Sequence, residues 1–255
     1  MQPLELYIHI PFCVKKCAYC DFLSGPAGEK EKEEYVKMLV DEIRNCPDTV
    51  QNYRVISIFF GGGTPSLLTG EQIGRLMDTV REIFTLDEDA EITMEMNPGT
   101  VTEEKLRKYR QAGVNRLSIG LQSVNDEELR LLGRIHTYEE FLEAYHLARA
   151  NGFANINVDL ISAIPGQTVE SWRRTLEQVM ALFPEHISAY SLILEEGTTF
   201  YKKYVEDEAK EGPKLPDEDA ERQMYWDTET LMEKNGYHRY EISNYAKEGY
   251  ACRHN

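Results

Sequence analysis

The chain has 255 residues, with 44 acidic and 28 basic side chains, and its formal net charge is −16. This length can bury the core of one large domain without disulfide bonds or structural metals. The negative charge argues against a protein that binds nucleic acid or an anionic membrane, because such a surface needs a basic patch. The sequence shows no signal peptide and no apolar run of about 20 residues that would span a membrane. We therefore expect a cytoplasmic protein with reduced thiols.

Apolar, strand-like runs alternate with amphipathic helical segments along most of the chain. Thr69 with Gln72 and Thr137 with Glu140 have the spacing of capping boxes, which begin helices. Alternating strands and helices predict a parallel sheet with right-handed crossovers. Six such units are too few for a closed eight-stranded barrel, so we expect an α/β fold with a partial (β/α)6 barrel, and a doubly wound sheet is the alternative. The predicted strands are Leu4–Ile10, Val55–Phe60, Glu91–Met96, Arg116–Leu121, Ile156–Ile161 and Ile187–Leu194.

The composition changes after about residue 196. Residues 206–221 include eight acidic and two basic side chains, which predicts a solvated loop. A helix is expected to follow, beginning near Pro216 and running to Lys234. The aromatic-rich segment 237–255 ends without a terminating element, so we expect a truncated region there. The expected organisation is a barrel domain over residues 1–196 and the start of an incomplete accessory region over residues 197–255.

Three of the five cysteines lie within eight residues. Cys13, Cys17 and Cys20 form a C-x3-C-x2-C pattern directly after the first predicted strand, where a barrel places its active site. A structural zinc site normally has four protein ligands, and His9, within the strand, is poorly placed to be the fourth. A [4Fe–4S] cluster held by three cysteines leaves one iron open for a chelating substrate, and we favour it. Cys46 instead follows the helical spacing of the apolar residues before it, which predicts a buried helix face.

The cysteine loop and its flanks resemble the radical S-adenosylmethionine (SAM) superfamily. The segment Tyr7–Cys13, of sequence YIHIPFC, is followed by Cys17 and by Cys20-Asp21-Phe22. This pattern is similar to the branch that contains oxygen-independent coproporphyrinogen III oxidases and HemW-type haem chaperones, and the resemblance extends along the whole chain. It implies a partial (β/α)6 barrel and a cluster bound by Cys13, Cys17 and Cys20. It also implies bound SAM, whose reductive cleavage gives a 5′-deoxyadenosyl radical.

Polar residues and glycines at the predicted strand ends are the other candidate site residues. The glycines before Thr64 allow backbone groups to approach a ligand, and no lysine of a phosphate loop follows them. Glu95, between two methionines, and Asp159, inside an apolar strand, need polar partners if they are buried, and Arg134 is a candidate partner for Asp159. In the family, several such positions can serve a second SAM molecule. The resemblance implies SAM contacts at Tyr7, Tyr19, Gly62, Gly63, Thr64, Glu95, Gln122, Arg134, Asp159 and Ile193.

Two features distinguish the branches of the family. The oxidase pattern has a fourth cysteine two residues after the third, where this chain has Phe22, so the resemblance to the haem chaperones is closer. The segments Tyr240–Ala246 and Cys252–Asn255 resemble the chaperone sequence that runs into an H-N-x-x-Y-W motif, in which His254 is a candidate haem ligand. The resemblance implies haem transfer to an acceptor protein, with an electron donor as a further partner. The alternatives are decarboxylation of coproporphyrinogen III and another radical SAM modification of a tetrapyrrole, such as methylation.

Overall fold

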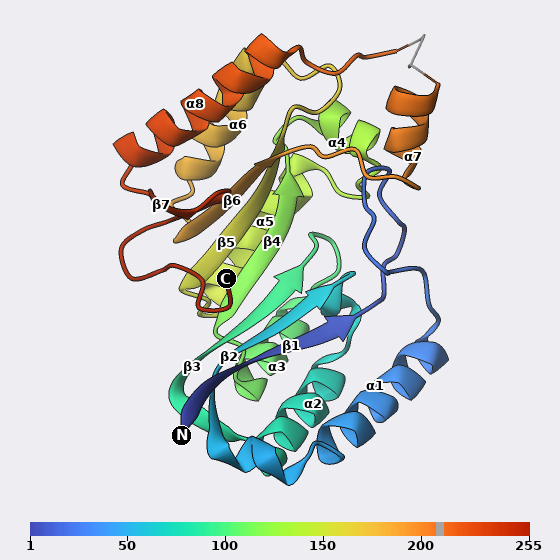
Figure 1. The fold of residues 1–255 in the computed structure, drawn as a ribbon, viewed down its shortest axis with the longest axis vertical. Coiled ribbons are helices and arrows are strands. Elements are labelled where there is room, and N and C mark those ends of the chain that lie inside the picture. The colour runs from blue at the N-terminus through green and yellow to red at the C-terminus, as the bar shows by residue number, and fades with distance from the viewer. Residues whose placement is uncertain (208–211) are drawn as a thin grey trace.

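The computed structural model describes residues 1–207 and 212–255, and these form one curled, eight-stranded sheet (Figure 1). Six parallel strands lie side by side in chain order, as they do in a barrel. The expected partial (β/α)6 barrel is confirmed, and the doubly wound alternative is wrong, because such a sheet reverses its strand order. These strands are β1 (Gln2–Ile10), β2 (Tyr53–Gly62), β3 (Thr85–Met96), β4 (Arg116–Gln122), β5 (Asn155–Ser162) and β6 (His186–Ser191).

Two short strands that were not predicted extend the sheet beyond β6. Strand β8 (Asn244–Ala246) pairs with β6 and strand β7 (His238–Glu241) pairs with β8, both in the antiparallel direction. Their sequence shows no clear strand pattern, because each strand is four residues or shorter and β7 is exposed along its whole length. The segment after residue 196 is therefore joined to the barrel through backbone hydrogen bonds.

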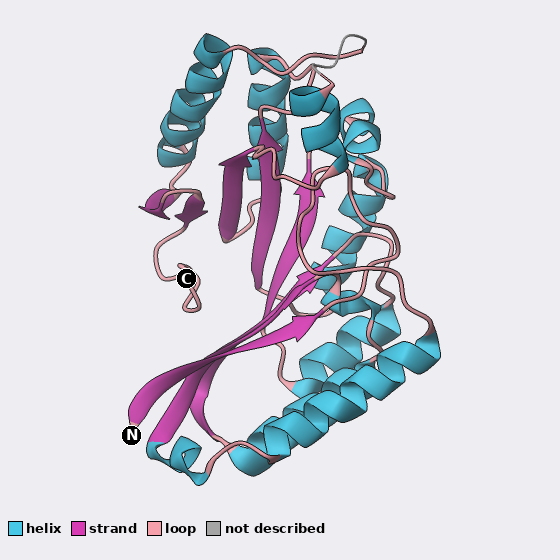
Figure 2. Ribbon diagram, turned by 45° about the vertical axis from the view of Figure 1, so that its right-hand side comes forward, coloured by secondary structure: helices cyan, strands magenta, loops and turns pink. Residues whose placement is uncertain are grey.

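Helices pack on the outer face of the curled sheet, and its concave face carries the C-terminal end of the chain (Figure 2). The predicted capping boxes at Thr69 and Thr137 are confirmed. Within the described residues, no helix combines the length and the apolar composition needed to cross a membrane. The helices are α1 (Glu29–Arg44), α2 (Gly70–Ile83), α3 (Glu103–Ala112), α4 (Asp126–Leu132), α5 (Tyr138–Ala150), α6 (Val169–Met180), α7 (Thr199–Tyr201) and α8 (Glu218–Lys234), with short turns η1 (Asp48–Asn52), η2 (Pro65–Leu67) and η3 (Lys202–Glu206).

The two faces of the sheet differ in polarity. On the outer face, alternate residues of β4 such as Leu117 and Ile119 belong to the apolar core between strands and helices. On the concave face, the residues between them, such as Arg116, Ser118 and Gln122, line a cleft. The interior of a closed barrel is normally filled with branched aliphatic side chains. Here the concave face is polar, which suits it to a polar ligand.

Two sequence-based expectations differ from the structure, and a third agrees with it. Strand β6 ends at Ser191, so Ile193 lies in the loop after it and not at a strand end. Cys46 lies two residues beyond α1, where it is only partly buried against the core, because the helix ends at Arg44. Helix α8 begins at Glu218 as expected to within two residues, and residues 208–211 of the predicted acidic loop lie outside the described residues.

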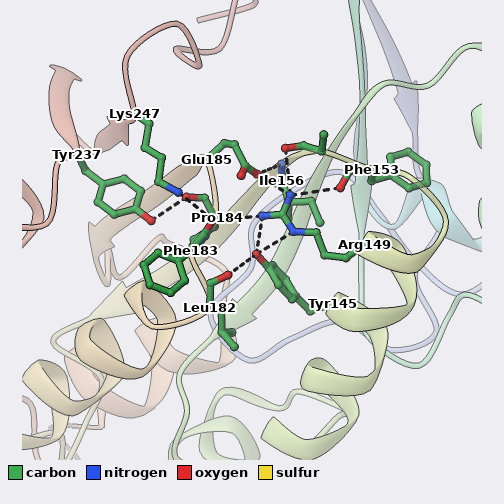
Figure 3. Close-up of polar contacts among 11 residues, drawn as sticks. Tyr145, Arg149, Phe153, Ile156, Leu182, Phe183, Pro184, Glu185, Tyr237 and Lys247 are labelled. Atoms are coloured by element: carbon green, nitrogen blue, oxygen red, sulfur yellow. Dashed lines mark hydrogen bonds and ion pairs between the residues drawn. The ribbon is translucent and has the colours of Figure 1, made fainter.

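A polar cluster ties the antiparallel strands to the barrel where β5 and β6 begin (Figure 3). Arg149 on α5 forms an ion pair of 2.8 Å with Glu185. The hydroxyl of Tyr237, just before β7, donates to the carbonyl of Pro184 at 2.7 Å. Lys247, just after β8, donates to the carbonyl of Phe183 at 2.9 Å. These contacts provide donors for the carbonyl groups of the loop between α6 and β6, and they connect that loop to the segments that flank β7 and β8.

Candidate cofactor-binding cleft

One cleft of about 510 Å³ lies on the concave face of the sheet. Its volume is within the range of about 300–1,000 Å³ that is typical of small-molecule sites. Of the predicted cluster ligands and SAM contacts, all but Tyr7 line it, whereas His254, the candidate haem ligand, does not. Those that do are Cys13, Cys17, Tyr19, Cys20, Gly62, Gly63, Thr64, Glu95, Gln122, Arg134, Asp159 and Ile193.

The loop that carries the three cysteines follows β1 and is fixed at both ends by backbone hydrogen bonds. The N–H of Cys13 donates to the carbonyl of Gly25 at 2.9 Å, and the N–H of Gly25 donates to that of Pro11 at 3.0 Å. Further along, the N–H of Ala18 donates to the carbonyl of Leu132 at the end of α4 at 2.9 Å. The loop is therefore held between β1 and α4, and its three cysteines line the cleft.

Two side chains from other elements donate hydrogen bonds to cysteine sulfurs. The hydroxyl of Thr64 donates to the Sγ atom of Cys13, and a guanidinium N–H of Arg134 donates to the Sγ atom of Cys17, each at 3.7 Å. Burial raises the pKa of the Cys20 thiol. The hydrogen bonds from Thr64 and Arg134 stabilise the thiolate forms of Cys13 and Cys17, and thiolates are the ligands that iron–sulfur clusters use.

The cysteine arrangement suits a cluster better than a single metal ion. Within residues 1–207 and 212–255, no three His, Cys, Asp or Glu side chains converge closely enough to hold one ion. A zinc ion would need ligand atoms about 2.0–2.3 Å from the metal. A cubane cluster is larger than an ion and takes its three thiolates from farther apart. Three thiolates on one loop fit a [4Fe–4S] cluster that keeps one iron open, whereas a structural zinc site takes four protein ligands.

The glycine run after β2 packs directly against the cysteine loop. The N–H of Gly63 donates to the carbonyl of Ile10 at 2.8 Å, and the N–H of Thr64 donates to that of Phe12 at 2.6 Å. A Cβ atom on Gly63 would lie 2.6 Å from the carbonyl oxygen of Phe12. Gly62 has a φ of +113°, a conformation that favours glycine. The glycines are thus required for the close approach of the two loops, in addition to any contact with a ligand.

Two carboxyl groups, of Glu95 and Asp159, face the cleft in different environments. Glu95 accepts a hydrogen bond from the N–H of Gly62 at 3.0 Å. Burial, reinforced by the charge of Asp159, raises the pKa of Glu95 to about 8. Burial also raises the pKa of Asp159, but hydrogen bonds from Asn157 and Ser118 oppose that effect. Asp159 is therefore the better stabilised anion of the pair, and Glu95 carries a proton in the ligand-free cleft at neutral pH.

Arg134 does not pair with Asp159, contrary to the suggestion from the sequence. Its guanidinium donates to the side-chain oxygen of Asn97 at 2.6 Å and to the carbonyl of Gly120 at 2.7 Å, in addition to Cys17. Asp159 accepts hydrogen bonds from neutral side chains of β4 and β5 instead. Arg134 thus links the cysteine loop to the ends of β3 and β4.

Gln122 has features that point to a ligand. It ends β4 with a φ of +72°, which is unusual for a residue other than glycine. Its side chain is buried, and its amide oxygen has no hydrogen-bond partner among the described residues. A buried acceptor without a donor is costly, and ribose hydroxyls can supply that donor. Gln122 therefore fits a nucleoside such as the adenosine part of SAM.

Tyr7 lies at the side of the site and not in its lining. Its ring is about half exposed and stacks on Phe59 and on His254, with ring centroids 6.1 and 6.0 Å apart. His254 is not a freely exposed terminal residue, as its position would suggest. It stacks on Phe59 at 5.2 Å, and its Nδ1 atom lies 3.2 Å from the hydroxyl of Ser57. The end of the described chain thus forms part of the concave face.

Sequence reasoning missed several residues of the cleft. Asn97 connects Thr64 with Arg134 through its side-chain amide, and Met-Asn-Pro at a strand end was the available signal. The other missed residues lie inside strands that read as apolar runs. Their signal is a polar side chain at every second position, which marks a strand with one polar face. These residues are Arg116, Ser118, Asn157, His186, Ser188 and Tyr190.

The fold is an α/β half-barrel with three cysteines after its first strand and a polar cleft on its concave face. This combination is typical of a protein that holds an iron–sulfur cluster beside an organic ligand. Residues 7–179 match the family model of the radical SAM superfamily. The chain belongs to this superfamily. Membership implies a [4Fe–4S] cluster and SAM as cofactors, in agreement with the residues that line the cleft.

Relatives that share at least 32% identity with the chain include haem chaperones and a coproporphyrinogen III oxidase. The chain is 44% identical to the haem chaperone HemW of Escherichia coli over 100% of its own length and 66% of that protein. It is 38% identical to HemW of Bacillus subtilis, over 98% of this chain and 65% of the relative. Among solved structures, coproporphyrinogen III oxidase (HemN) from Escherichia coli has a TM-score of 0.86 at 32% identity, covering 97% of this chain and 56% of that one. The chain thus spans about two thirds of the length of these curated relatives.

Proposed function

We propose that this chain is the radical SAM part of a haem chaperone of the HemW type, which binds a [4Fe–4S] cluster, SAM and haem and transfers haem to an acceptor protein. The observation that carries the proposal is Phe22. It lines the cleft two residues after Cys20, where a coproporphyrinogen oxidase would have a fourth cysteine. Similarity to HemW proteins along the whole chain supports the same branch.

In the proposed site, Cys13, Cys17 and Cys20 hold the cluster, and an electron donor supplies its electrons. When bound, the cluster would supply an open iron for chelation by SAM and an electron for the reductive cleavage of SAM. Glu95 and Asp159 contribute negative charge to the same cleft. The proposed SAM contacts are Tyr7, Tyr19, Gly62, Gly63, Thr64, Glu95, Gln122, Arg134, Asp159 and Ile193.

The proposed haem contact is His254. Its ring stacks with Tyr7 and Phe59 on the concave face, so an axial ligand there would place haem beside the SAM site. We further propose that residues 1–196 form the barrel domain and that residues 197–255 begin an accessory region. The cytoplasm is the proposed compartment, because three cluster thiolates need a reducing environment.

The experiment that tests the proposal is an anaerobic titration of haem into the cluster-loaded protein, followed by its Soret absorption. We expect saturable binding at one haem per chain, and transfer of that haem to an apo-acceptor protein. A His254→Ala variant should bind haem more weakly while its iron content from the cluster is unchanged. A titration without a saturable Soret change would count against the haem chaperone.

Coproporphyrinogen decarboxylation is the second candidate, favoured by the structural likeness to HemN. Anaerobic incubation of the cluster-loaded protein with coproporphyrinogen III, SAM and a reductant tests it. Formation of protoporphyrinogen IX would establish the oxidase. We expect no such product, because Phe22 replaces the cysteine of the oxidase pattern.

A further inference from the structure

A chain of hydrogen bonds runs from the C-terminal segment to the cleft. The backbone N–H of Cys252 and the side-chain amide of Asn255 both donate to the hydroxyl oxygen of Tyr240, each at 3.1 Å. That hydroxyl lies 2.7 Å from the Nε2 atom of His186 on β6. Tyr240 itself, on β7, is not part of the cleft lining.

The chain continues from His186 to Asp159. The Nδ1 atom of His186 lies 2.6 Å from the side-chain oxygen of Asn157. The side-chain N–H groups of Asn157 donate to the Oδ1 atom of Asp159 and to the hydroxyl of Ser118, both at 2.7 Å. Ser118 in turn donates to the Oδ2 atom of Asp159 at 3.0 Å. Each carboxylate oxygen of Asp159 thus has a donor that other residues hold in place.

The partners of each group fix the direction of every hydrogen bond. Both N–H groups of Asn157 are used, so its oxygen can only accept, and His186 must donate from Nδ1. Burial and the charge of Arg116 lower the pKa of His186 to about 2, so its ring is neutral. A neutral imidazole has one donor and one acceptor, and Nε2 is therefore the acceptor. Tyr240 consequently donates to His186, and all the donors point toward Asp159.

We propose that Tyr240, His186 and Asn157 are positioning residues that form a directional relay, and that this relay orients Asp159 and holds it as the ionised carboxylate of the cleft. The inference rests on the proposed function, in which Asp159 contacts SAM. Hydrogen bonds aligned in one direction polarise one another. The relay thereby makes the affinity of the cleft depend on Tyr240 of β7, which lies outside the lining, and on the segment 250–255, of which Cys252 and Asn255 line the cleft.

Other charged and titratable groups also face Asp159. Glu95 on β3, Arg116 on β4 and Tyr190 on β6 line the same cleft. Arg116 lowers the pKa of Asp159, and the charge of Asp159 contributes to the raised pKa values of Glu95 and Tyr190. A test must therefore change the relay and leave these three groups in place, which a substitution at Tyr240 does.

The test compares Tyr240→Phe with a matched Tyr237→Phe control. Each substitution removes one tyrosine hydroxyl and its hydrogen bond, but that of Tyr237 donates to the carbonyl of Pro184 in the polar cluster of Figure 3, away from the relay. SAM is titrated into cluster-loaded protein by calorimetry between pH 6 and pH 9. We expect Tyr240→Phe to weaken SAM binding about three- to tenfold, as the loss of one hydrogen bond would, and Tyr237→Phe to leave it unchanged.

The pH profile separates a relay from a structural role. With a weaker relay the Asp159 anion is less stabilised, so its pKa rises and the loss of SAM affinity on acidification begins at a higher pH in Tyr240→Phe than in the control. Equal affinities, or a lower affinity with an unchanged pH profile, would overturn the relay.

A second measurement does not depend on SAM. Nitrogen NMR of the histidine rings in the ligand-free protein should place the proton of His186 on Nδ1, and a proton on Nε2 would overturn the relay. Absence of SAM binding by the wild-type protein would contradict the proposed function alone, because the tautomer of His186 can still be measured.

Discussion

Glu95 should release a proton when SAM binds. Its pKa of about 8 means that at pH 7 about ten carboxyls are protonated for each one ionised, or about 0.9 proton per site. SAM carries cationic ammonium and sulfonium groups, and a cation beside Glu95 favours the ionised form. Binding at pH 7 should therefore expel close to 0.9 proton from Glu95, and SAM affinity should fall as the pH decreases from 9 to 6.

Calorimetry in buffers of different ionisation enthalpy measures this proton release. The amino group of SAM can also lose a proton when it binds iron, so the informative quantity is the difference between the wild-type protein and Glu95→Gln. The glutamine keeps the acceptor for the N–H of Gly62 but cannot titrate. We expect the variant to release about 0.9 proton fewer at pH 7, and the difference to vanish near pH 10. Equal proton release by the two proteins would refute the assignment of Glu95 as the titrating contact.

Three further predictions concern the cluster loop and the cleft. Cys17→Ala should abolish the cluster, because two thiolates cannot hold a cubane with one open iron; unchanged iron content and visible absorption after anaerobic reconstitution would contradict this. Asp159→Ala should weaken SAM binding while cluster assembly stays normal, and equal SAM affinity in calorimetry would remove Asp159 from the site. Gly63→Ala should lower the free energy of unfolding by about 1–3 kcal/mol, because its Cβ would lie 2.6 Å from the backbone oxygen of Phe12. Gly74→Ala is the control: nothing lies within 4 Å of its Cβ position on α2, so thermal unfolding should show a gain of about 0.5–1 kcal/mol, and equal destabilisation of both variants would refute the packing argument.

The order of the parallel strands and the position of the cysteine loop could be predicted from the sequence. Local patterns determine both: apolar periodicity marks the strands, and three cysteines in eight residues mark the loop. The carboxyl ends of parallel strands meet at one edge of a sheet, so Glu95 and Gln122 were expected near the cysteines, and the structure brings them there.

The features that could not be predicted depend on contacts between distant segments. Arg134 was a plausible partner for Asp159 from its charge, but Ser118 on β4 and Asn157 on β5 donate to the carboxylate instead. The stacking of His254 on Phe59 had no local signal, because the two residues are almost two hundred positions apart in the sequence. Strands β7 and β8 are too short to show periodicity, and pairing with β6 is what makes them strands.

The contacts of Thr64 and Arg134 with cysteine sulfurs also have an electrochemical consequence. Reduction adds negative charge to a cluster, and hydrogen-bond donors or a cation beside its sulfurs stabilise that charge. Thr64 and Arg134 supply one neutral and one cationic donor to two of the three thiolates. A cluster bound on this loop would therefore have a higher midpoint potential than without these two donors, and a weaker reductant would be sufficient to reduce it.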